Sequence, residues 1–65
     1  MAQHGLDHHD LALCWTYGTQ SREFHAGKRW EDVEGLLRDG WLRVRGLSRL
    51  EWDAALPHVR AAWEA

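Results

Sequence analysis

The residues of this sequence best suited to metal chemistry gather near its start. Three histidines, two aspartates and the only cysteine fall within eleven positions: His4, Asp7, His8, His9, Asp10 and Cys14. Imidazole and carboxylate groups suit Zn, Ni or Cu, and histidines four residues apart on one helix can chelate a metal from one face. His4, however, precedes the predicted start of the first helix. We therefore predict no metal site and no cofactor, with His4, His8 and His9 as the only metal-binding candidates.

A second group of chemistry-bearing residues is the arginine-rich segment between the second and third predicted helices. Its cations are Arg38, Arg43, Arg45 and Arg49, and Leu42 is predicted to lie exposed among them. The planar guanidinium group pairs with carboxylates and phosphates through two hydrogen bonds, so this segment is a candidate binding surface. We predict that a partner binds at five residues: Arg38, Leu42, Arg43, Arg45 and Arg49.

The same arginines leave a nucleic-acid alternative open, because two helices joined by a tight turn resemble the outline of DNA-binding motifs. Asp39 and Glu51 lie in the same segment, and Glu34–Arg38 and Asp39–Arg43 are spaced to form ion pairs along one helix. No helix carries the Asn, Gln and Arg run that base readout favours. Nucleic-acid binding is therefore the second hypothesis, after protein binding.

Catalysis is disfavoured by the positions of the nucleophilic side chains. Cys14 could act as a thiolate beside a histidine. Its place on the predicted inner face of the first helix instead indicates a buried and inert thiol. Ser48 is predicted to cap a helix, and a chain of 65 residues offers little concave surface for a substrate. We predict that the protein is not an enzyme.

Composition limits the architecture that can hold these residues. A chain of 65 residues forms one domain, and a single cysteine excludes an internal disulfide. Five tryptophans supply the apolar mass that a small core needs. The net charge of −2 argues against general binding to polyanions. Neither a signal peptide nor an apolar stretch of about 20 residues is present, so we expect a cytoplasmic protein that does not enter a membrane.

Apolar residues at helical spacing predict three helices, at about residues 8–22, 30–45 and 49–64. Asp7 is predicted to cap the first helix, and Ser48 with Glu51 forms a capping-box pattern for the third. Pro57 should bend the third helix on its solvent side. The predicted inner faces consist of Leu11, Leu13, Cys14, Trp15, Tyr17, Gly18, Phe24, Trp30, Val33, Leu37, Trp41, Val44, Trp52, Ala55, Leu56, Val59, Ala62 and Trp63.

Four tryptophans repeat at a constant interval. Trp30, Trp41, Trp52 and Trp63 are each separated by eleven residues, which is about three helical turns. Each helix of the second half thus carries two indoles on one face. This pattern predicts an antiparallel hairpin of the second and third helices, closed by the first into a compact all-α three-helix bundle.

The tryptophan pattern resembles a small uncharacterised bacterial domain found in hypothetical proteins and in the tails of stress-related proteins. The resemblance spans roughly Tyr17 to Trp63 and rests on Tyr17-Gly18, Trp30 to Glu34, Leu37-Arg38 with Trp41, Gly46 to Ser48 with Leu50 and Trp52, and Val59-Arg60 with Trp63. The histidine-rich start departs from it. The resemblance implies a helical fold and bacterial origin but carries no chemistry.

These observations together predict a small domain for protein–protein interaction or self-association. Tryptophan and arginine are the residues that most often dominate binding interfaces, and five indoles are hard to bury fully in so short a chain. The alternative is a nucleic-acid-binding accessory protein that uses the arginine-rich segment.

Overall fold

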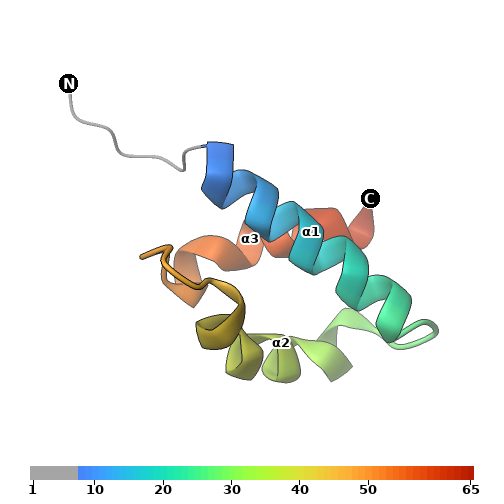
Figure 1. Cartoon of the computed structure of the whole chain (residues 1–65). Helices are drawn as coiled ribbons and strands as arrows, with labels where there is room; N and C mark the ends of the chain where they lie inside the picture. The colour runs from blue at the N-terminus through green and yellow to red at the C-terminus, as the bar shows by residue number, and fades with distance from the viewer. Residues whose placement is uncertain (1–7) are drawn as a thin grey trace.

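The computed structural model describes residues 8–65, which form three helices and no strand. Helix α1 spans His8–Phe24, α2 spans Trp30–Val44 and α3 spans Trp52–Glu64 (Figure 1). The predicted all-α three-helix bundle is therefore confirmed. The cap at Asp7 lies outside the described residues.

The closest packing of helix backbones is between α1 and α3, which run in the same direction (Figure 1). Gly18 of α1 permits this approach, because a Cβ atom there would lie 2.6 Å from Ala62 Cβ and closer still to the Val59 carbonyl oxygen. At its end, α1 is fastened by Arg22, whose guanidinium donates hydrogen bonds to the carbonyl oxygens of Trp63, at 3.0 Å, and Ala65. The small residues at the crossing explain why these two helices come closest.

Helices α2 and α3 form the predicted antiparallel hairpin through their tryptophans. Trp30 at the start of α2 meets Trp63 at the end of α3, with ring centroids 5.7 Å apart. Trp41 and Trp52 pair in the same way at the other end, at 5.8 Å. The bulk of these rings keeps the two backbones further apart than those of α1 and α3. The repeat of eleven residues thus places one indole pair at each end of the hairpin.

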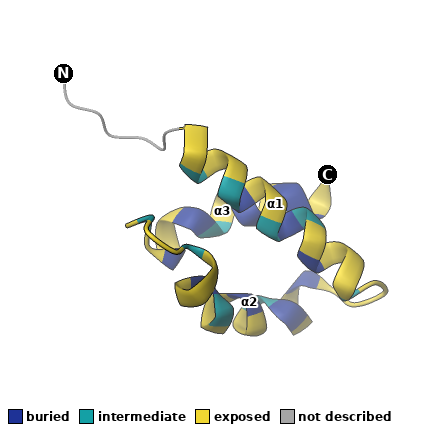
Figure 2. Ribbon diagram, in the orientation of Figure 1, coloured by how far each residue is buried: buried dark blue, intermediate teal, exposed yellow. Residues whose placement is uncertain are grey.

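The core is made of the faces that the three helices turn toward one another (Figure 2). Its buried apolar side chains are Cys14, Trp30, Val33, Leu37, Trp41, Trp52, Ala55, Val59, Ala62 and Trp63. Four residues predicted for the inner faces are instead exposed: Leu11 is 41%, Trp15 51%, Phe24 84% and Val44 38% accessible. The apolar arc of α1 is wider than the strip that α3 can cover, and this leaves Trp15 and Phe24 at its two margins.

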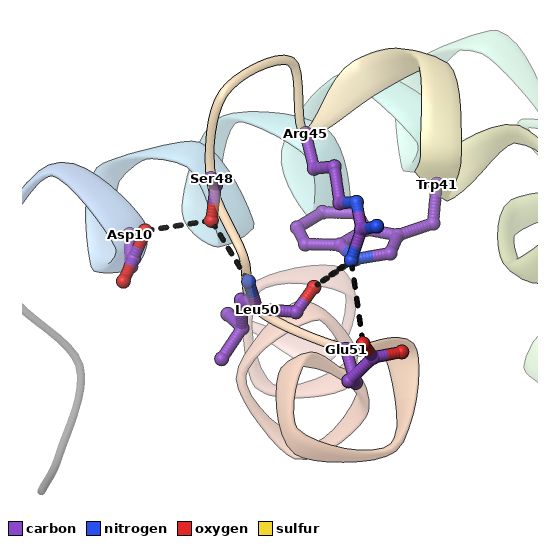
Figure 3. Close-up of polar contacts among 6 residues, drawn as sticks. All are labelled: Asp10, Trp41, Arg45, Ser48, Leu50 and Glu51. Atoms are coloured by element: carbon purple, nitrogen blue, oxygen red, sulfur yellow. Dashed lines mark hydrogen bonds and ion pairs between the residues drawn. The ribbon is translucent and has the colours of Figure 1, made fainter.

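The connection before α3 differs from the prediction. The helix begins at Trp52 after Glu51, three residues later than expected, and no side chain caps it. The capping role predicted for Ser48 is wrong. Its hydroxyl donates to Asp10 Oδ1 at 2.8 Å and accepts a hydrogen bond from the Leu50 amide at 3.2 Å (Figure 3). Ser48 therefore fastens the loop to α1 through a hydrogen bond to a carboxylate, which is stronger than one between neutral groups.

Pro57 lies inside α3, which continues through it to Glu64. Its ring is exposed, as predicted, so the proline removes one backbone hydrogen bond without disturbing the core.

Candidate protein interaction surfaces

The five residues predicted to bind a partner do not form one surface. Arg45 belongs to the loop that joins α2 to α3. Its guanidinium donates to the Leu50 carbonyl oxygen at 3.1 Å and lies 3.8 Å from the Glu51 carboxylate (Figure 3). The indole N–H of Trp41 donates to the same carbonyl at 2.8 Å. With only 23% of its side chain exposed, Arg45 stabilises the loop that leads into α3.

The other four predicted residues are exposed. Arg38 and Arg43 are five residues apart on α2, which separates their side chains by about 140° around the helix. Arg38 lies 4.0 Å from the Asp39 carboxylate, a weak contact between two exposed groups. Leu42 is 67% exposed, and Arg49 lies exposed in the loop. Neither ion pair predicted along α2, Glu34–Arg38 or Asp39–Arg43, is formed.

One apolar surface is a groove between α1 and α2, called here the α1–α2 groove. It has a volume of about 630 Å³, which is enough to receive several side chains of a partner. Figure 1 shows the two helices, which are joined at one end by the loop 25–29. The groove is lined by Leu13, Thr16, Tyr17, Gln20, Ser21, Phe24, His25, Leu36, Leu37, Gly40, Arg43 and Val44.

Tyr17 of α1 lines the groove and links α1 to α2. Its hydroxyl donates a 2.8 Å hydrogen bond to the Leu37 carbonyl oxygen of α2, and its ring packs 5.6 Å from that of Trp41. Burial raises the pKa of the Tyr17 hydroxyl, and the charge of Arg43 opposes that rise. The groove is therefore a fixed feature of the fold, held by contacts that also involve the core.

Charge and exposure in the groove are unevenly distributed. Of the described residues that line it, Arg43 alone carries a fixed charge, and none is acidic. Phe24 is 84% exposed and Leu36 57%, so both present large apolar areas to solvent. This surface was not predicted from the sequence, because Phe24 was assigned to the core and Leu36 was not singled out. One feature of the sequence could have revealed this surface: the apolar arc of the first helix is too wide for one neighbouring helix to cover.

A second apolar surface lies on the other side of α1, where α1 meets α3. Leu11 is 41% and Trp15 51% exposed, and a hollow of about 540 Å³ lies beside them. This surface, the α1–α3 hollow, is lined by His8, Leu11, Ala12, Trp15, His58 and Ala61. No described residue of fixed charge lines it.

The structure brings no metal-ligand cluster together within residues 8–65. His8 and His9 are exposed on the first turn of α1, and His4 lies outside the described residues. Cys14 is fully buried, and this burial, with a smaller contribution from the charge of Asp10, raises the pKa of its thiol. A raised pKa disfavours the nucleophilic thiolate.

No helix within residues 8–65 combines the length and apolar character needed to cross a membrane. Comparisons of the chain with protein-family models, curated proteins and solved structures find no match. The resemblance suggested by the tryptophan pattern stays a prediction, and the apolar surfaces of the domain carry the functional argument.

Proposed function

We propose that this chain is a small interaction domain that binds an apolar segment of a protein in the α1–α2 groove. The observation that carries the proposal is the exposure of Phe24 and Leu36 on the two walls of one groove. Burying a side chain of this size in an interface gains about 1.5–3 kcal/mol. Contiguous exposed apolar surface is a mark of an interaction site.

Arg43 gives this surface a charged group that can orient the bound segment. A lone arginine beside exposed aromatic and aliphatic side chains provides a cationic anchor for a carboxylate on the bound segment. Three of the residues predicted from the sequence lie on α2, which forms one wall of the groove: Arg38, Leu42 and Arg43. Only Arg43 lines the groove. The proposed partner is another protein or a second copy of the chain.

Nucleic-acid binding through the arginine-rich segment is the weaker proposal. Arg45 is committed to the loop, Arg38 and Arg43 lie on different sides of α2, and the net charge is −2. Affinity for a phosphate backbone depends on several cations acting along one track. The arrangement of the arginines supports protein binding better.

The experiment that tests the proposal is an affinity pull-down from native extract with three forms of the chain, read by quantitative mass spectrometry. They are the natural sequence, the groove variant Leu36→Glu, and Leu47→Glu as the control, because Leu47 is fully exposed in the α2–α3 loop. We expect a protein that is retained after nuclease treatment, lost with Leu36→Glu and kept with Leu47→Glu. Retention that nuclease abolishes would instead support nucleic-acid binding. Retention equal in all three forms would contradict the groove as the binding surface.

A further inference from the structure

The α1–α3 hollow combines a protruding side chain and a cavity on one face. Trp15 projects from α1 with half of its surface exposed, and Leu11 lies one turn before it. The hollow beside them is bounded on α3 by His58 and Ala61. On the α1 wheel, the residues of the hollow and those of the α1–α2 groove lie on nearly opposite sides, so the two surfaces are separate.

The charge of this face is suited to contact with an identical face. In a twofold dimer each patch meets its own copy, so a fixed charge near the axis would face a like charge. Among residues 8–65, no Asp, Glu, Lys or Arg lines the hollow, in a chain of which 28% is charged. A neutral apolar face of this kind brings no repulsion when it meets itself, and it offers no charge to select another partner.

The shape of the face also favours contact with a second copy of the chain. A twofold contact needs a protrusion and a recess on one patch, so that each copy fills the other. Trp15 is the protrusion, and the volume of about 540 Å³ beside it is large enough to receive an indole ring. The parallel helices α1 and α3 of two copies would then stack as four helices around a shared apolar layer.

We propose that a second copy of this chain packs on the α1–α3 hollow and forms a twofold dimer through Trp15 and Leu11. This inference deepens the self-association included in the proposed function, but it rests on residues that the groove does not use. The two proposals can therefore fail separately: the pull-down depends on Leu36, and the dimer depends on Trp15.

The available area sets the expected strength of the dimer. A standard interface takes about 800 Å² from each partner, which is about one sixth of the 4750 Å² of this molecule. The hollow occupies only the first half of α1 and the second half of α3. We therefore expect an interface at the lower end of the size range and a dissociation constant in the micromolar range.

Sedimentation equilibrium over about 5–500 µM tests the proposal, because this range brackets a micromolar dissociation constant. We expect the mass of the full chain to rise from 7.6 kDa toward twice that value, with little effect of salt because no ion pair crosses the interface. Trp15→Lys should remain monomeric throughout. Ala61→Lys should do the same from α3 without removing a packed side chain, and a cooperative thermal melt would show that each variant folds.

Phe24→Lys is the matched control, since it places the same charge in the α1–α2 groove. It should dimerise as the natural chain does. A natural chain of monomer mass at the highest concentration would overturn the proposal. So would dimerisation unchanged in folded Ala61→Lys and Trp15→Lys, or dimerisation lost only in Phe24→Lys, which would place self-association in the groove.

Discussion

Gly18 sets the distance between α1 and α3, and this contact gives the first prediction. Gly18→Ala would force a Cβ atom against the Val59 carbonyl and Ala62, so the helices must separate. We expect the free energy of unfolding to fall by about 1–3 kcal/mol, as in other overpacked cores. Gly35→Ala is the matched control, since nothing lies within 4 Å of its Cβ position, and it should stabilise α2 by up to about 1 kcal/mol. Urea denaturation measures both, and an equal response of the two variants would refute the close contact.

Cys14 and Tyr17 make the fold sensitive to alkaline pH. Burial raises the pKa of both groups, so the folded state holds their protons more tightly than the unfolded state does. Their contribution to stability is complete below the unfolded pKa values and declines as the pH rises above about 9. We expect the urea midpoint to fall between about pH 8 and pH 10.5, and to fall less in the double variant Cys14→Ala/Tyr17→Phe. An equal fall of the urea midpoint with pH in both proteins would show that Cys14 and Tyr17 do not cause it.

The exposure of individual side chains was the part of the structure least accessible from sequence. Trp15, Phe24 and Val44 have the composition and spacing of core residues, and helical periodicity assigns them correctly to an apolar arc. Which part of that arc is covered depends on how closely the neighbouring helix approaches, and this is decided by Gly18 on a different turn. The α1–α2 groove could not be predicted for the same reason.

At the scale of elements, Pro57 in α3 gives a stabilising substitution. Alanine there restores an N–H that can donate to the Asp53 carbonyl, and proline in a helix interior costs about 3 kcal/mol. Loss of the rigid ring from the unfolded chain offsets about 0.4–1 kcal/mol of that gain. We therefore expect Pro57→Ala to raise the free energy of unfolding by about 2–2.6 kcal/mol, and His58→Ala, at the next exposed position, to change it little. A loss of stability in Pro57→Ala would show that α3 depends on its proline.

The loop between α2 and α3 gives a test of how Ser48 acts. Ser48→Ala should cost about 1 kcal/mol, because it removes the hydrogen bond to Asp10 and the turn at Leu50. In the Asp10→Ala background the same substitution should cost less, with a coupling of at least about 0.5 kcal/mol. A double-mutant cycle in urea measures this coupling. Additive costs would show that Ser48 acts only within the loop and not through Asp10.

The helices themselves were largely predictable, and for a physical reason. The tryptophan interval of about three turns fixes one face of α2 and of α3. The short connection between these helices makes them antiparallel, with one indole pair at each end. The start of α3 was misplaced, because Ser48 and Glu51 have the spacing of a capping box. In the structure the Ser48 hydroxyl does not cap α3 but forms a long-range hydrogen bond with Asp10.

At the scale of the whole molecule, the domain separates an interior of four tryptophans from two apolar surfaces on opposite sides of α1. Trp30, Trp41, Trp52 and Trp63 are all less than 10% exposed, so the indoles that stabilise the fold are not the ones available to partners. Trp15 is the exception, because half of its surface is exposed. The arginine-rich segment, which the sequence favoured as the binding surface, is divided between the loop, the groove and the outer side of α2.

The measurement that tests this account most directly is photo-crosslinking in native cells. A benzophenone amino acid would replace Phe24 in the groove, Leu11 beside the hollow, or Arg49 in the loop, one position at a time. The account predicts an adduct with another protein from position 24, an adduct of twice the chain mass from position 11, and neither from position 49. Protein adducts from position 49 alone, with none from position 24, would contradict it.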